Sequence, residues 1–122
     1  MIRSIALASV MMVAMVAPGF AQDAASLVGK YAVTGTDTDG AKYEPGSLVI
    51  GKEASGALSI NWDGGDYVGV GQVTGNVLAV AAVADGKSSI FIMNIAPDGS
   101  LSGKWWRRTD PGSKGTEVWK KK

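Results

Sequence analysis

The sequence predicts an all-β fold, a single antiparallel up-and-down eight-stranded small β-barrel after a cleaved signal peptide. Turn-forming residues recur roughly every 8–12 residues, which is the spacing of a barrel or sandwich. Between the turns, apolar and polar side chains alternate over segments of strand length. No stretch after Gln22 resembles an amphipathic helix of useful length. At 122 residues, the chain is long enough for one domain.

The N-terminus has the features of a secretory signal peptide. Arg3 supplies a positive charge, and an uncharged apolar run follows from Ile5 to Ala17. This run is shorter than the about 20 residues that a membrane-spanning helix needs. Small residues at Gly19 and Ala21 then fit a cleavage site. We therefore expect residues 1–21 to be a signal peptide.

Residues 22–122 are then the small β-barrel domain, with no transmembrane segment. The signal peptide predicts a bacterial protein that is periplasmic or secreted. Because the chain is exported, we expect no nucleic acid among its partners. The sequence leaves its oligomeric state open.

The composition excludes several kinds of chemistry. The chain has no cysteine and no histidine. It therefore cannot form a disulfide, a thiolate metal site, a cysteine nucleophile or a serine–histidine couple. We expect no catalytic residue, no metal and no cofactor, and hence a protein that is not an enzyme. A hydrolase that uses only carboxylates stays open as an alternative.

Turn signals divide the domain into eight expected strands. Glycine accepts positive φ, while Asp and Asn side chains fold back onto local backbone. The turns are Asp39-Gly40, Ser55-Gly56, Asp63-Gly64-Gly65, Gly75-Asn76, Asp85-Gly86, Pro97-Asp98-Gly99 and Asp110-Pro111-Gly112. The expected strands are Leu27–Thr34, Ser47–Lys52, Ala57–Trp62, Tyr67–Thr74, Val77–Ala84, Ser88–Ile95, Leu101–Arg108 and Thr116–Lys120.

The strands differ in how their apolar residues are arranged. Alternation is clearest in Leu58–Trp62, which predicts one buried and one solvated face. Val77–Val83 and Ile90–Ile95 are apolar on both faces apart from Asn94, so we expect a tail, a partner or another subunit to cover their outer side. Closing the meander removes its two exposed edges, and an open sandwich is the structural alternative.

Two strings of residues carry a resemblance. The segment Leu27–Gly35 contains Gly29-Lys30-Tyr31 followed by alternating apolar residues, and it resembles the opening strand of lipocalins, avidins and periplasmic inhibitors of secreted metalloproteases. The segment Asp98–Trp105, followed by Gly115-Thr116-Glu117, resembles small exported bacterial proteins of unknown function, some loosely labelled fibronectin-binding. The resemblance implies an exported meander barrel. It assigns no functional residue, since avidin's biotin-site pattern and the inhibitors' disulfide cysteines are absent.

The string Trp105-Trp106-Arg107-Arg108 is the candidate binding site. Adjacent strand residues point to opposite faces, so Trp105 is expected in the core and Trp106 outside with Lys104 and Arg108. An exposed tryptophan beside cations is typical of interface hot spots. We therefore take Trp106, Lys104, Arg107 and Arg108 as candidate partner-binding residues. The alternative is that Trp106 merely covers the barrel exterior under a stacked Arg108.

Acidic side chains gather in two turns. Asp37-Thr38-Asp39-Gly40 has the opening rhythm of a calcium loop, but a calcium loop of this type needs a glutamate where Leu48 stands, which favours an ordinary turn. Asp63 and Asp66 flank two glycines and could form a carboxylate pair, although a solvated turn tip favours no catalysis. An enzyme would need two of these groups, or one with Glu44, close together in a cleft.

These observations predict an exported, non-enzymatic binding module of the bacterial envelope that engages a protein or small-molecule partner through its surface or barrel rim. An eight-stranded barrel can hold one small ligand or fill with side chains, and the inward Leu, Ile, Val and Trp residues favour filling. A periplasmic inhibitor of a secreted hydrolase is the alternative within the same class. A ligand-binding barrel would show a cavity of roughly 300 Å³ or more.

Overall fold

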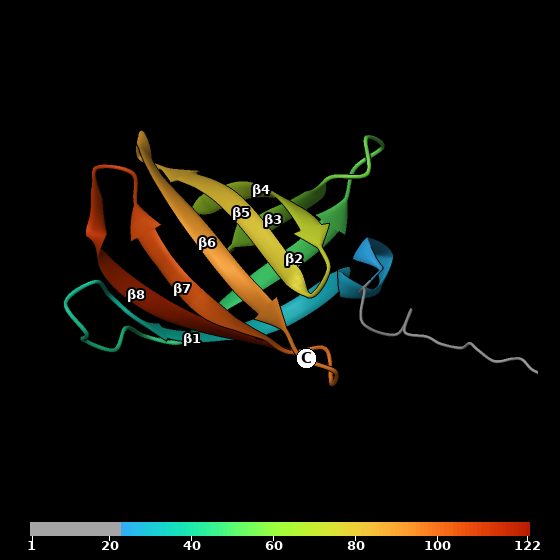
Figure 1. Cartoon of the computed structure of the whole chain (residues 1–122), viewed down its shortest axis with the longest axis horizontal. Coiled ribbons are helices and arrows are strands. Elements are labelled where there is room, and N and C mark those ends of the chain that lie inside the picture. Colours follow the sequence, from blue (N-terminus) through green and yellow to red (C-terminus); the bar gives the residue numbers. More distant parts are fainter. Residues whose placement is uncertain (1–22) are drawn as a thin grey trace, which may run out of the picture.

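The computed structural model describes residues 23–122, and the expected signal peptide at residues 1–21 lies outside the described residues. The described chain is a closed barrel of eight antiparallel strands preceded by one short 3₁₀ helix (Figure 1). The elements are η3 (Ala24–Leu27), β1 (Gly29–Thr36), β2 (Gly46–Lys52), β3 (Leu58–Trp62), β4 (Tyr67–Thr74), β5 (Val77–Ala84), β6 (Lys87–Ile95), β7 (Leu101–Arg107) and β8 (Asp110–Lys121).

The strand order is that of an up-and-down meander. Each strand pairs with the next in sequence, and β1 pairs with β8 from Tyr31↔Lys121 to Thr36↔Thr116. This last ladder closes the sheet and leaves it without an edge, which confirms the barrel and excludes the open sandwich. No described helix is long and apolar enough to cross a membrane.

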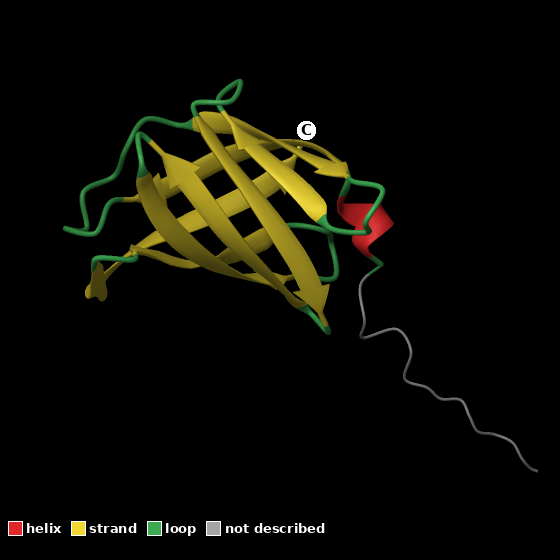
Figure 2. Ribbon diagram, turned by 90° about the horizontal axis from the view of Figure 1, so that it is seen from above, coloured by secondary structure: helices red, strands yellow, loops and turns green. Residues whose placement is uncertain are grey.

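The two ends of the barrel differ. The capped end carries η3 and the turns that follow β2, β4 and β6, and Figure 2 shows the helix in red at this end. Leu27 of η3 is buried, and its carbonyl accepts a hydrogen bond of 2.6 Å from the Tyr31 hydroxyl. The open end carries the long β1–β2 loop and the turns that follow β3, β5 and β7.

The assignment of Leu27 and the position of the last turn were wrong. Leu27 belongs to η3 rather than to the first strand, because the Asp23 side chain caps the helix by accepting from the Ala25 N–H at 3.1 Å. At the other end of the chain, Asp110-Pro111-Gly112 lies inside β8 and is not the turn. Arg107 pairs with Asp110 across a tighter turn, and the register then shifts to Trp106↔Lys114. This bulge accommodates Pro111, which has no N–H to give to a ladder.

The alternation of inward and outward side chains along the strands buries the residues that the sequence predicts for the core. In β3 the side chains of Leu58, Ile60 and Trp62 are buried, and in β8 those of Glu117 and Trp119 are. The outer faces of the two apolar segments are not covered by any described residue. Val83, Ile90 and Ile92 are exposed there, together with Val68 and Val70 of the neighbouring strand β4.

Candidate functional site

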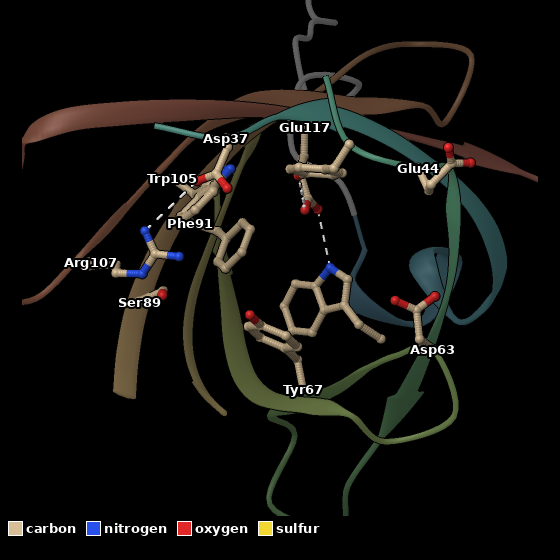
Figure 3. A pocket seen from close by; sticks show the side chains of 11 residues that line it. Asp37, Glu44, Asp63, Tyr67, Ser89, Phe91, Trp105, Arg107 and Glu117 are labelled. Atoms are coloured by element: carbon tan, nitrogen blue, oxygen red, sulfur yellow. Dashed lines mark hydrogen bonds and ion pairs between the residues drawn. The ribbon is translucent and has the colours of Figure 1, made fainter. Parts of the chain in front are cut away.

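A cavity of about 350 Å³ opens at the open end of the barrel (Figure 3). Its walls come from the β1–β2 loop and from residues at or near the open ends of β3, β4, β6, β7 and β8. Its aromatic lining is Tyr43, Trp62, Tyr67, Phe91 and Trp105. Its polar lining is Asp37, Glu44, Asp63, Ser89, Arg107 and Glu117.

The aromatic rings pack against one another and fix the shape of the wall. Phe91 stacks on Trp105 with ring centroids 5.9 Å apart, and it also contacts Trp62 at 4.9 Å and Trp119 at 6.3 Å. Trp62 also meets Trp119 edge-on at 5.8 Å. Offset and edge-to-face contacts of this kind are the favoured arrangements of aromatic pairs. The cavity is therefore lined by rings that hold one another in place without a ligand.

Glu117 is the buried acidic residue of the site, with 6% of its surface exposed. It lies on the inner face of β8 because it is two residues before the buried Trp119. Its Oε1 accepts from Trp62 Nε1 at 3.1 Å and from Trp119 Nε1 at 2.7 Å. Its Oε2 accepts from the hydroxyl of Tyr43. Three donors from three different elements thus converge on one carboxylate.

Burial raises the pKa of Glu117 above its usual 4.5. The hydrogen bonds from Tyr43, Trp119 and Trp62 act in the opposite direction, since they stabilise the ionised form, while the charge of Asp63 adds to the rise. The pKa of the Tyr43 hydroxyl is also raised, first by burial and then by its hydrogen bond to Glu117. Tyr43 therefore stays protonated and serves as a donor to the carboxylate.

Two glycines make room for this arrangement. A methyl group at Gly35 would collide with the Tyr43 hydroxyl, and one at Gly115 would collide with Trp105 Nε1. Neither glycine has a positive φ, so it is space rather than backbone conformation that excludes a side chain. With that space open, Trp105 Nε1 donates to the Thr36 carbonyl at 3.2 Å. Glycine is thus the residue that lets the rings approach the β1–β8 ladder.

Arg107 stands at the rim of the cavity. Its guanidinium lies 5.2 Å above the Trp105 ring and 3.8 Å from an Asp37 carboxylate oxygen. Both side chains of this ion pair are partly exposed, at 37% and 49%, so solvent and salt screen it. The pair holds two charges of opposite sign on one side of the opening (Figure 3).

The structure separates the four residues of the candidate partner-binding site. Arg107 lines the cavity, whereas Lys104 and Trp106 line a groove on the outer face of β6, β7 and β8. Arg108 is exposed in the β7–β8 turn. Trp105 is buried and Trp106 faces outward half-buried, as the alternation predicts. The cation over the Trp106 ring is Lys114 at 5.4 Å, rather than the expected Arg108.

The acidic turn residues are only partly brought together. Asp37, Glu44 and Asp63 line the cavity, but Figure 3 shows Asp37 on the side opposite Glu44 and Asp63. Asp39 and Asp66 are exposed and lie outside the lining. The Asp63 carboxylate accepts from the Ser47 N–H at 2.9 Å, which gives it a role in holding the β2 start.

The Asp37–Gly40 segment is an ordinary turn. Asp37 and Asp39 accept from the N–H groups of Thr38 at 2.7 Å and Ala41 at 2.9 Å. Among residues 23–122, no group of three or more acidic side chains is placed to hold a metal ion. The rhythm of the sequence here reflects local backbone hydrogen bonding.

Sequence reasoning missed Glu117, Tyr43 and Ser89. Glu117 had a signal, because it lies two residues before Trp119 in the expected strand Thr116–Lys120 and so shares its face with a large apolar side chain. Ser89 likewise shares a face with Phe91. Tyr43 had none, since it lies in a loop whose fold over the barrel end is set by tertiary contacts.

The fold and the cavity together define the class: a closed, up-and-down, eight-stranded β-barrel with a cavity open at one end. No protein-family model and no curated protein matches the chain. Among solved structures, the chain is similar to the crystal structure of the wild-type fluorescent protein UnaG, with a TM-score of 0.52 and 12% identity. The match covers 80% of this chain and 98% of UnaG. By its name this neighbour is a fluorescent protein, and at 12% identity the likeness concerns the fold alone.

Proposed function

We propose that this protein is an exported, non-enzymatic binding module that takes a small molecule into the cavity at the open end of the barrel. The observation that carries the proposal is the cavity itself. Its volume of about 350 Å³ lies within the range of small-molecule sites, and its wall is aromatic with a few polar groups, as in such sites. The sequence favoured a barrel filled with side chains. The cavity means that this expectation was wrong for the open end of the barrel.

The way in which Glu117 is held favours binding over catalysis. A general acid needs a proton that it can give to the substrate. Both oxygens of Glu117 instead accept hydrogen bonds, and the two indole donors cannot act as acceptors. Asp37, on the far side of the cavity from Glu44 and Asp63, is engaged by Arg107. This arrangement supports a fixed recognition group rather than an acid–base pair.

The cellular location is part of the proposal and follows from the sequence of residues 1–21. The mature chain would then begin at Gln22 in the periplasm or outside the cell. Mass spectrometry of the protein from a cell-envelope fraction tests this. A chain that retains Met1 and stays in the cytosol would contradict it.

Native mass spectrometry tests the ligand proposal. The full chain is expressed in bacteria, purified from the envelope without denaturant and compared with two variants. Ser89→Leu puts a larger side chain into the cavity, while Ser88→Leu changes the neighbouring outward residue as a control. We expect a small-molecule adduct on the wild type and on Ser88→Leu, and its loss on Ser89→Leu. Equal adducts on all three proteins, or none on any, would overturn the proposal.

A protein partner is a second candidate, favoured by the outer groove that Trp106 and Lys104 line. Tryptophan beside lysine is typical of interface anchors, and inhibition of a secreted hydrolase is one form that this binding could take. A pull-down from envelope extract with the wild type and Trp106→Ala side by side tests it. Loss of a specific partner with Trp106→Ala supports the surface site, and an unchanged set of partners contradicts it.

A further inference from the structure

We infer that the ligand of the cavity is a small organic cation, an ammonium group on an apolar body, with the ammonium placed between Glu117 and Ser89. This inference rests on the proposed function, because it specifies the chemistry of the molecule that the cavity takes. It is carried by the balance of charge in the lining, by the aromatic wall, and by one buried hydroxyl.

The ionisable lining is predominantly acidic. Asp37, Glu44, Asp63 and Glu117 face a single cation, Arg107. Arg107 is already paired with Asp37 at the rim. The cavity therefore has an excess of negative charge, which attracts cations and disfavours anions.

Glu117 is the strongest part of this excess because it is buried. Its three partners, Trp62, Trp119 and Tyr43, are neutral donors, and no described cationic side chain forms an ion pair with it. A buried carboxylate without a countercharge is costly, and a cation supplied by a ligand would compensate it. Two carboxylate oxygens offer about four acceptor positions, so three donors leave room for one more.

The aromatic wall suits a cation with an apolar body. The faces of tryptophan, tyrosine and phenylalanine rings attract ammonium groups, and rings together with carboxylates form the cages that bind organic cations. The site already contains one such contact, because the Arg107 guanidinium lies over Trp105. The volume of about 350 Å³ holds on the order of ten non-hydrogen atoms at about 30 Å³ each.

Ser89 is an independent sign of a missing partner. Only 6% of its surface is exposed, and it lies on the inner face of β6. Its hydroxyl has no hydrogen-bond partner among residues 23–122. Buried polar groups are almost always satisfied by protein, water or ligand. An ammonium N–H directed at this hydroxyl would satisfy it.

Three probes of matched shape test the inference by isothermal titration calorimetry on the wild-type protein: 2-phenylethylamine, 2-phenylethanol and phenylacetate. At neutral pH they are a cation, a neutral molecule and an anion. We expect the amine to bind about tenfold or more tightly than the alcohol, and the anion to bind weakest. This comparison needs no variant, so it does not depend on any substitution being tolerated.

Variants then assign the effect to the site. Glu117→Gln keeps the approximate shape but removes the charge, and it should abolish the preference for the amine over the alcohol. Glu53→Gln, an exposed residue beyond β2 at the capped end, removes an equal charge as a control and should leave this preference unchanged. Ser89→Ala should weaken the amine about threefold or more, a smaller loss than that of a charge.

The outcomes distinguish this inference from the proposed function. If the alcohol or the anion binds as tightly as the amine, or if Glu117→Gln lowers all affinities equally, the cation inference is wrong and the binding cavity stands. If none of the three probes binds and no adduct is found by native mass spectrometry, both are wrong.

Discussion

The capped half and the open half of this barrel are built by the same strands but in different ways. The capped half is filled by buried aliphatic side chains: Leu27, Ile50, Leu58, Leu78, Ile95 and Leu101. The open half is lined by rings and carboxylates around a cavity of about 350 Å³. Aliphatic side chains adapt to one another and pack to high density. The aromatic rings of the open half contact one another, two of them donate hydrogen bonds to Glu117, and they leave a space of fixed shape.

The difference separates stability from recognition within one small domain. A chain without cysteine gains no disulfide, so its stability depends on barrel closure and on the packed half. The open half includes a buried carboxylate and a buried hydroxyl without a described partner, both of which cost stability. Groups that are costly for folding and placed in a cavity are typical of binding sites.

The largest expected effect is in the capped half. Leu101 is fully buried at the start of β7, so Leu101→Ala should lower the free energy of unfolding by about 2–5 kcal/mol, because it leaves a void among packed side chains. Urea denaturation measures this. Binding of 2-phenylethylamine by the folded fraction should be unchanged. A loss below about 1 kcal/mol would mean that this half is not tightly packed.

The next effect concerns the space around the rings. Gly115→Ala places a methyl group against Trp105 and the Thr36 carbonyl, and should cost about 1–3 kcal/mol by overpacking. Gly112→Ala, in the same strand, meets no atom within 4 Å and should be nearly neutral. Thermal unfolding of both variants checks the pair. Equal effects would show that Gly115 is not required by its contact with Trp105.

Glu117→Gln should change how stability depends on pH. Because the pKa of Glu117 is raised above its usual 4.5, the folded chain holds this proton more tightly than the unfolded chain. Its contribution to stability is fully present below about pH 4.5 and is lost as pH rises through the raised pKa. The stability of the wild type relative to Glu117→Gln should therefore fall as pH rises from 4.5. Unfolding free energies from urea titrations at a series of pH values measure this, and a difference that rises with pH would contradict the raised pKa.

The smallest expected effect is at the rim. Asp37→Asn removes the ion pair with Arg107, whose side chains are both more than a third exposed. The change in unfolding free energy should stay within about 0.5 kcal/mol and should vanish in high salt. Urea denaturation at low and high salt checks this. A loss of several kcal/mol would show that the open half depends on its rim charges.

The fold could be predicted from the sequence because turns and strand alternation are local signals. The strand Tyr67–Thr74 and the strand Val77–Ala84 begin and end in the structure as the sequence predicts. The β7–β8 turn could not be placed, because Asp110-Pro111-Gly112 has turn chemistry and only the pairing of Arg107 with Asp110 shows that it forms a bulge.

The site was less accessible to sequence reasoning. The pattern at Trp105–Arg108 singled out strand β7, in which Arg107 lines the cavity and Trp106 lines the outer groove. Partner binding through Trp106 stays a prediction. Strand parity put Glu117 on the same face as Trp119. One of the hydrogen bonds to this buried carboxylate comes from Tyr43, which lies in a loop 74 residues earlier in the chain. Contacts of such separation leave no pattern in a single sequence.

Binding of an organic cation in the cavity can be observed through the four tryptophan indole N–H signals in a two-dimensional ¹H–¹⁵N spectrum. Trp62 and Trp119 donate to Glu117 and Trp105 lines the cavity, whereas Trp106 lies on the outer face. On titration with 2-phenylethylamine, we expect the signals of Trp62, Trp105 and Trp119 to shift together in a saturable manner while that of Trp106 stays in place. A shift of Trp106 alone, or no shift at saturating amine, would contradict binding of the cation in the cavity.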